Sequence, residues 1–220
     1  MLNIIIIIFL LILLYFYEEE KNSITENLEY LPCIKMQENC KIAFIAKKYN
    51  NSDEEILRIN NYKNYCKNCS FSLFVYDKIF ANDINLNKIL MIKKIMKNEK
   101  YKYIIWMDTK KPIKNLIVSF ERMINKYDKS NIIFPYNGNI VLDYFIIKNC
   151  PWSKSMIDKL EEYIENNIKN NNINISNHIK SVMMTNKYLG IEQKIKLVSI
   201  SEFDEIINDK KISKESAQSK

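Results

Sequence analysis

The sequence predicts an α/β fold with a mostly parallel sheet flanked by helices. Short apolar runs of strand length alternate with longer segments that carry apolar residues at helical spacing. The chain has 220 residues, of which 47% are hydrophobic, and this suffices for one domain-sized core. Only two glycines occur, so neither a P-loop nor the dinucleotide-binding glycine fingerprint is available. Such alternation implies right-handed crossovers between parallel strands.

The first predicted element is a transmembrane helix over residues 2–17, which are apolar apart from Asn3. As a helix they would span about 24 Å, shorter than the roughly 30 Å of an average bilayer but compatible with a thin early-secretory membrane. No small residue stands near a signal-peptide cut site, so we interpret the segment as an uncleaved signal-anchor, with a cleaved signal peptide as the alternative. Residues 18–40 are polar and aperiodic, which predicts a stem.

The predicted domain covers residues 41–205, and its first half alternates strand with helix. Ser52 and Glu55 form a capping box, which is typical of a helix start. Apolar residues then recur at helical spacing before the third strand. The predicted strands are 41–47, 71–76 and 103–107, and the predicted helices are 52–67 and 86–97.

In the second half, Pro112 predicts a helix start, because the N–H that proline lacks is not needed in the first turn. We expect that helix to run to residue 127. Asparagine dominates residues 166–177, which favours a loop, and residues 206–220 form a tail that we expect to be disordered from 213. Strands are predicted at 131–134 and 144–148, and a further helix at 152–169.

Composition limits the classes of partner. The net charge of +7 comes from lysines spread along the chain rather than clustered with aromatic residues, so we expect no nucleic-acid partner. The single histidine, His178, excludes a histidine-rich metal site and is interpreted as a surface residue. Five cysteines leave at least one unpaired, and Cys33 with Cys40 and Cys66 with Cys69 are candidate bridges.

Four motifs, in the same order along the chain, resemble glycosyltransferase family 34, which includes α-galactosyl-, α-1,6-mannosyl- and xyloglucan xylosyltransferases of the secretory pathway. The likeness covers about residues 41–163. The third motif is an apolar strand with a tryptophan that ends in an aspartate. The motifs are Asn-Tyr-Lys-Asn-Tyr-Cys (61–66), Lys-Ile-Leu-Met-Ile-Lys-Lys (88–94), Ile-Ile-Trp-Met-Asp (104–108) and Phe-Ile-Ile-Lys-Asn-Cys-Pro-Trp-Ser through to Asp (145–158).

This resemblance implies the GT-A nucleotide-diphosphosugar transferase fold for the predicted domain. It also implies transfer of a hexose, galactose or mannose, from a nucleoside-diphosphate sugar to a glycan acceptor. The protein would be a single-pass type II protein of the Golgi or endoplasmic reticulum membrane, with its C-terminal body in the lumen. A complex with other glycosyltransferases is a further partner that the resemblance allows.

The resemblance places the donor site at the end of the strand 103–107. The family holds Mn²⁺ against the donor diphosphate with an Asp-x-Asp motif, of which this chain keeps Asp108 and replaces the second acid with Lys110. We therefore assign Asp108, Lys110 and Lys111 to binding of the donor diphosphate, and Asp108 to a metal only if one is bound. Lysine meets phosphate as a point charge and cannot ligate a metal as a carboxylate does. No catalytic residue is assigned.

Two other interpretations stay open. The chain keeps motifs that serve the core and loses those that serve the donor, which is the pattern of a catalytically inactive family member acting as a non-catalytic partner in a glycosylation complex. A cleft filled by a side chain such as Tyr144 would favour that reading. At single positions the structural alternatives are a core role for Trp106 and a capping role for Asp108 ahead of a helix at Pro112.

Overall fold

The computed structural model describes residues 40–76, 83–108, 112–114, 119–168, 174–188 and 194–207. The signal-anchor predicted at 2–17, almost all of the stem, Lys110, Lys111 and the tail from 208 lie outside these ranges. Within the ranges, every helix is too short or too polar to cross a membrane.

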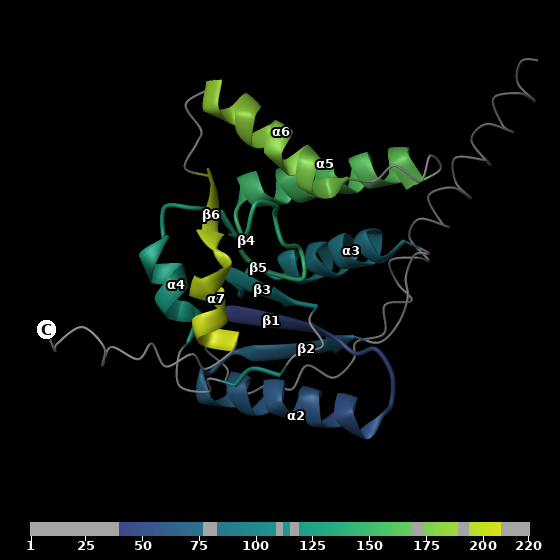
Figure 1. Ribbon diagram of the computed structural model, residues 1–220, viewed down its shortest axis with the longest axis vertical. Coiled ribbons are helices and arrows are strands. Elements are labelled where there is room, and N and C mark those ends of the chain that lie inside the picture. Colours follow the sequence, from purple (N-terminus) through teal and green to yellow (C-terminus); the bar gives the residue numbers. More distant parts are fainter. Residues whose placement is uncertain are drawn as a thin grey trace, which may run out of the picture. The chain divides into compact units, whose positions relative to one another are not determined.

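The described residues contain a six-stranded mixed sheet with the strand order β2-β1-β3-β5-β4-β6 (Figure 1). Parallel pairs join β1 to β2, β1 to β3 and β4 to β6, whereas β5 is antiparallel to both of its neighbours. Five of these strands therefore run in one direction, which confirms the predicted α/β fold with a mostly parallel sheet. The strands are β1 (Ile42–Lys47), β2 (Ser72–Tyr76), β3 (Tyr103–Met107), β4 (Ile132–Tyr136), β5 (Tyr144–Lys148) and β6 (Ile195–Ser199).

Helices α2 (Asp53–Asn68), α4 (Phe120–Lys126) and α7 (Ile200–Ile207) cover one face of the sheet. Phe44 of β1 lies at the centre of this face and makes ring contacts with Tyr62, Tyr65 and Phe120 at centroid distances of 5.5, 6.1 and 6.3 Å. Large aromatic side chains dominate such a core because each removes a large apolar area from water. This packing fixes α2 against β1, next to the loop where β1 ends.

Helices α3 (Ile84–Met96), α5 (Pro151–Ile168) and α6 (Ile175–Tyr188) lie on the other face. In Figure 1, α3 and α5 lie together on the side of the sheet opposite α2. Their apolar residues, which include Ile89, Ile157 and Ile179, enclose a small cavity against Phe145 of the sheet. Trp106 is fully buried, which confirms its interpretation as a core residue.

The helix predicted from Pro112 to residue 127 is wrong in its first half. Residues 112–114 are not helical, and α4 begins at Phe120 after an N-cap at Ser119. The Asn61 side chain holds Ile113 in this non-helical path: it accepts the Ile113 N–H and donates to the Ile113 carbonyl, each at 2.8 Å, and that carbonyl is the group that the next turn of a helix would use. The alternative in which Asp108 caps a helix at Pro112 is therefore also wrong.

The asparagine-rich tract is more helical than predicted. Helix α5 ends at Ile168, close to its predicted end at 169, but α6, which the sequence analysis did not predict, begins at Ile175 within the tract. Asn174 accepts a hydrogen bond from the N–H of Asn177 at 2.9 Å, so this asparagine acts as a helix cap. Strand β6 and helix α7 were also not predicted.

The candidate bridge between Cys66 and Cys69 is not formed. Both are free thiols, as is Cys40, whose candidate partner Cys33 lies outside the described residues. Cys66 is buried on α2, and burial raises the pKa of its thiol well above its usual range. Cys69 is the C-cap of the same helix. The position of Cys66 in the core makes it a packing residue.

Candidate functional site

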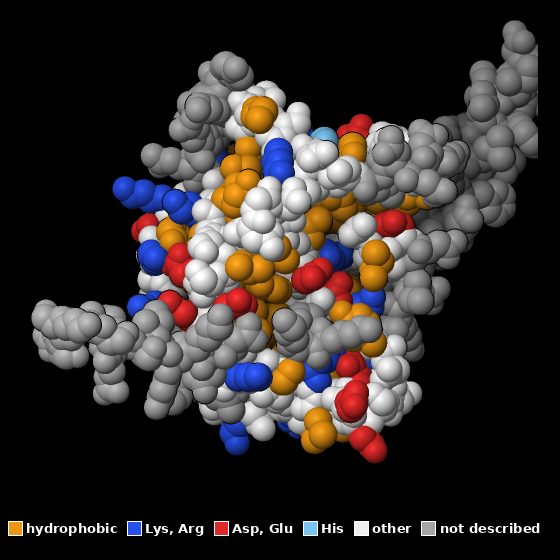
Figure 2. All heavy atoms as spheres, viewed as in Figure 1, with side chains coloured by type: hydrophobic (Ala, Val, Ile, Leu, Met, Phe, Trp, Pro, Cys, Tyr) orange, Lys and Arg blue, Asp and Glu red, His pale blue; other side chains and the backbone are white. Residues whose placement is uncertain are grey.

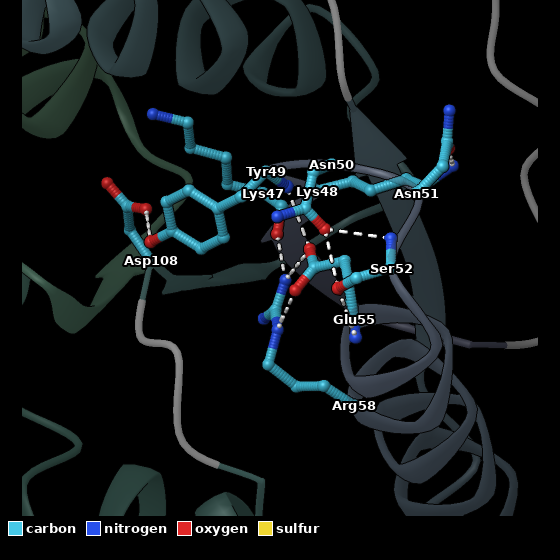
Figure 3. A network of polar contacts seen from close by, with 9 residues as sticks. All are labelled: Lys47, Lys48, Tyr49, Asn50, Asn51, Ser52, Glu55, Arg58 and Asp108. Carbon is cyan, nitrogen blue, oxygen red and sulfur yellow. Dashed lines mark hydrogen bonds and ion pairs between the residues drawn. The ribbon is translucent and has the colours of Figure 1, made fainter.

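The candidate site lies at the carboxyl edge of the sheet, where β1 and β3 end side by side. Ala46 pairs with Met107 in the parallel register, so the residues just beyond them reach the same place. There the hydroxyl of Tyr49 donates a hydrogen bond to Oδ1 of Asp108 (Figure 3). The N–H of Asp108 in turn donates to the carbonyl of Asp143 at 2.5 Å. The predicted site residue Asp108 is therefore held through both its side chain and its backbone.

Lys88 of α3 reaches the second carboxylate oxygen of Asp108. Its Nζ lies 3.8 Å from Oδ2, donates to the carbonyl of Leu142 at 2.8 Å and stands 5.5 Å from the centroid of the Trp106 ring. Only 8% of each side chain of the ion pair is exposed. Burial lowers the pKa of Lys88, and the nearby charges of Asp108 and Asp143 oppose that shift. Tyr49 thus contacts one oxygen of the Asp108 carboxylate, and Lys88 contacts the other.

A buried ion pair on α2 fixes the loop that carries Tyr49. The Glu55 carboxylate accepts the Tyr49 N–H at 2.7 Å and Nε of Arg58 at 2.8 Å, and Arg58 also donates to the carbonyl of Lys47 (Figure 3). The predicted capping box is thus half formed: Ser52 accepts the Glu55 N–H at 3.3 Å, but the Glu55 side chain turns to Tyr49 and Arg58. We name Glu55 and Arg58 the α2 clamp.

Charge interactions in the clamp are strong because both side chains are almost fully buried. Burial raises the pKa of Glu55, but the hydrogen bonds from Arg58 and from the Tyr49 N–H outweigh this effect and keep it below the usual value. The Arg58 guanidinium also lies 5.3 Å from the Tyr49 ring centroid and 4.9 Å from that of Tyr62. The tyrosine that contacts Asp108 is thus held at its backbone and at its ring.

Ile113 and Lys114, which follow Asp108 in the chain, are each held by a hydrogen bond to a distant residue. Asn61 of α2 holds Ile113, and the N–H of Lys114 donates to the carbonyl of Ile207 at 2.8 Å. These contacts fix the point from which the segment 109–111 returns to the described structure. Lys110 and Lys111, which were predicted to contact the donor, belong to that segment and lie outside the described residues.

The described residues do not fit a divalent cation. Among them no group of three or more His, Cys, Asp or Glu side chains could hold a metal ion. Both oxygens of the Asp108 carboxylate are engaged by Tyr49 and Lys88. Asp158, at the end of the fourth motif, pairs instead with Lys93 at 2.7 Å. Hard divalent cations need several oxygen ligands, and this arrangement offers one carboxylate that already has partners.

The edge carries more cationic than anionic side chains. Four cations, Lys47, Lys48, Lys88 and Arg58, stand against the three carboxylates of Glu55, Asp108 and Asp143. Nζ of Lys47 lies 5.0 Å from the Tyr49 ring centroid, so it belongs to the same cluster. An edge with an excess of positive charge attracts anions, of which a diphosphate is one.

Tyr144, which was named as a side chain that could fill the cleft, turns toward α7. Its ring packs on Phe203 at a centroid distance of 5.4 Å, and burial raises its pKa to about 12. The side chain that covers Asp108 is Tyr49, which sequence reasoning missed, as it missed the contribution of Lys88. A lysine within the apolar pattern of the helix predicted at 86–97 was the available signal for Lys88. No sequence signal pointed to Tyr49, because a tyrosine after a strand is common.

The motifs that carry the family resemblance include structural residues. Asn149, in the fourth motif, donates through Nδ2 to the carbonyls of Met96 and Tyr101 at 3.2 and 2.9 Å. Asn61, in the first, anchors the loop after β3. These asparagine side chains donate hydrogen bonds to backbone carbonyls that would otherwise lack a partner among the described residues. They therefore have a structural role at these positions.

No protein-family model matches the chain, and no curated protein sequence matches it. Among solved structures, the chain is similar to the crystal structure of a glycosyltransferase involved in the glycosylation of the major capsid of PBCV-1. The TM-score is 0.57 at 9% sequence identity, and the match covers 77% of this chain and 91% of that one. The chain therefore has the fold of a glycosyltransferase.

Proposed function

We propose that the chain is a glycosyltransferase that binds a nucleoside-diphosphate sugar where β1 and β3 end, and transfers a hexose to a glycan acceptor. One observation carries the proposal: in a glycosyltransferase fold, Asp108 follows β3 at the carboxyl edge of the sheet, within a cluster that has excess positive charge. Open α/β sheets bind their ligands at this edge. Galactose and mannose are the donor sugars that the resemblance to family 34 favours.

In this proposal the cationic side chains meet the diphosphate. Lys47 is a partly exposed cation of the edge, and Lys110 and Lys111 follow Asp108 within three residues in the sequence. The α2 clamp holds the end of β1 that carries Lys47, through the hydrogen bond from Arg58 to the Lys47 carbonyl. Lysine is suited to this task because it binds phosphate as a flexible point charge.

The apolar residues 2–17 support a membrane-anchored protein of the Golgi or endoplasmic reticulum, with the body in the lumen beside its glycan acceptor and other glycosyltransferases. Nucleic acid is not a proposed partner. On the face that Figure 2 shows, Lys and Arg side chains are scattered among acidic ones instead of forming a stripe.

The second candidate function is that of a non-catalytic partner in a glycosylation complex. A specific observation favours it: the Asp108 carboxylate is only 8% exposed, and both of its oxygens have partners within the chain. An aspartate in this state is less available to a ligand than an open one. The fold and its core would be kept in either case.

The test is donor binding and turnover by the purified full-length chain. Isothermal titration with UDP and GDP, each with Mn²⁺ or with EDTA, measures binding. UDP-galactose and GDP-mannose with oligosaccharide acceptors then measure transfer. Binding with transfer supports the enzyme, whereas the absence of binding supports the non-catalytic partner. If neither nucleotide binds in any condition, the donor site proposed at this edge is wrong.

A further inference from the structure

We propose that the ammonium group of Lys88 takes the place of a divalent cation beside Asp108, so that this site binds a nucleoside diphosphate without metal. The nucleotide part of this inference rests on the proposed function, whereas the cation part rests on the geometry of Lys88 alone.

The first argument is the set of groups around Lys88 Nζ. A carboxylate oxygen lies at 3.8 Å, a backbone carbonyl oxygen at 2.8 Å and the face of an indole at 5.5 Å. These come from the end of β3, from Leu142 in the loop before β5 and from Trp106 within β3. Carboxylate and carbonyl oxygens are the ligands that a hard metal ion would use. The lysine therefore occupies oxygen atoms that a metal would need.

The second argument is charge. The Lys88 ammonium neutralises the Asp108 carboxylate with which it forms a buried ion pair, and Asp143, the other carboxylate that acts on Lys88, is exposed to solvent. A divalent cation added beside Asp108 would face the Lys88 ammonium across a few ångströms in a poorly solvated place, where like charges repel strongly. The buried pair thus needs no metal for its charge balance.

The third argument is the engagement of the other oxygen. Tyr49 donates to Oδ1 of Asp108, and the α2 clamp holds the backbone of Tyr49 through Glu55. Coordination of a metal through both carboxylate oxygens would break this hydrogen bond and the packing of the ring beside Arg58. Each of the two carboxylate oxygens that a metal would bind therefore already has a partner within the chain.

The competing explanation is a structural ion pair with no relation to a ligand. Buried pairs of this kind are often no more stabilising than apolar residues of the same size. A purely structural pair predicts that Lys88→Met changes stability alone. A cation that serves the diphosphate predicts that this variant also loses nucleotide affinity, whereas Lys93→Met, on the same helix but paired with Asp158 and Glu161 at the surface, does not.

The cation part is tested with Mn²⁺ alone on the full-length chain, using the electron paramagnetic resonance signal of free Mn²⁺. We expect wild type and Asp108→Asn to give the same titration, because Asp108 holds no metal. A Mn²⁺ site in wild type that Asp108→Asn removes would overturn the inference. This comparison requires that both wild type and Asp108→Asn fold. If Asp108→Asn does not fold, Asp108→Glu takes its place. A Mn²⁺ site whose affinity changes in Asp108→Glu would also overturn the inference.

The nucleotide part is tested by titrating UDP and GDP into the chain. We expect equal affinity in Mn²⁺ and in EDTA, and a loss of about 30-fold in Lys88→Met, because removing one partner of a buried charge contact has an effect of this order. Lys93→Met is the matched control and should bind as wild type does. Affinity that requires Mn²⁺ in wild type contradicts the inference. If no nucleotide binds at all, the proposed function and the nucleotide part fail, while the Mn²⁺ titration still decides the cation part.

A variant that gains a Mn²⁺ site would support the inference directly. Lys88→Glu combined with Tyr49→Phe replaces the ammonium with a second carboxylate and frees Oδ1 of Asp108. We expect this double variant to bind Mn²⁺, with a signal loss that wild type lacks and that Asp108→Asn in the same background reverses. A double variant that folds, as judged by circular dichroism, and shows no Mn²⁺ site would count against the idea that Lys88 stands where a metal could be bound.

Discussion

The hydroxyl of Tyr49 donates a hydrogen bond to the carboxylate of Asp108, which joins two residues 59 positions apart in the sequence. This contact ties the loop after β1 to the end of β3, and it covers the one acid that the sequence analysis assigned to the donor site. Burial and the hydrogen bond to Asp108 both raise the pKa of Tyr49, so the hydroxyl stays protonated and remains a donor at neutral pH.

Tyr49→Phe should destabilise the protein while keeping the ring in place. The variant removes one hydrogen bond to a charged group, which contributes about 1.5–3 kcal/mol. Urea denaturation of both proteins measures the change in the free energy of unfolding. Tyr136→Phe is the matched control, because among the described residues the hydroxyl of Tyr136 has no hydrogen-bond partner, and it should be close to wild type. Equal stabilities of Tyr49→Phe and wild type would show that the contact with Asp108 contributes nothing.

Arg58→Met should be among the more damaging single substitutions in this edge of the sheet. It leaves the buried Glu55 carboxylate without its cation, and breaking a buried ion pair costs about 3–5 kcal/mol. Glu55→Gln together with Arg58→Met should recover part of that loss, since no unpaired charge remains. A double-mutant cycle from urea denaturation gives the coupling energy.

The control for the α2 clamp is Lys126→Met, which breaks the ion pair with Glu202. More than half of the Lys126 side chain is exposed, so water screens this pair, and the variant should change stability much less than Arg58→Met. If the two variants were equally destabilising, the burial of the clamp would not be the reason for its strength.

The stability of the protein should fall as the pH rises above 10. Burial raises the pKa of Tyr62 to about 12, so the native state keeps a proton that the unfolded chain releases from pH 10 upward. The contribution of Tyr62 is complete below pH 10 and is lost toward pH 12, at a rate that approaches about 1.4 kcal/mol per pH unit. Urea denaturation at pH 9, 10 and 11 measures the slope, which should be smaller in Tyr62→Phe. Identical slopes in the two proteins would contradict the raised pKa.

Asn61→Ala should loosen the chain just after Asp108. The variant removes two hydrogen bonds to the backbone of Ile113, each with a net contribution of about 0.5–1.5 kcal/mol. Hydrogen exchange at the Ile113 amide should become faster, and the free energy of unfolding should fall. Asn167→Ala removes a side-chain bond within α5 and should leave Ile113 unchanged. Unaltered exchange at Ile113 in Asn61→Ala would mean that other contacts hold this loop.

Much of the sheet could be predicted from the sequence, because its strands are apolar runs of the expected length. The strand predicted at 103–107 agrees with β3, and the predicted order of strands and helices agrees as far as α5. The helix predicted from Pro112 failed because only local signals favoured it, whereas the side chain of the distant Asn61 takes the Ile113 carbonyl that a helix would have used. Such partners are distant in sequence and leave no periodic pattern.

The sequence by itself determined the α/β class and the position of Asp108 at the end of a buried strand, because these follow from periodicity and from residue identity. Only the tertiary structure decided what Asp108 touches. The register of β1 with β3 brings Tyr49, which follows β1, to the carboxylate, and the position of α3 on the face of the sheet opposite α2 brings Lys88 to it. Hydrogen bonds and ion pairs depend on distance in space, which a sequence does not record for residues that are far apart along the chain.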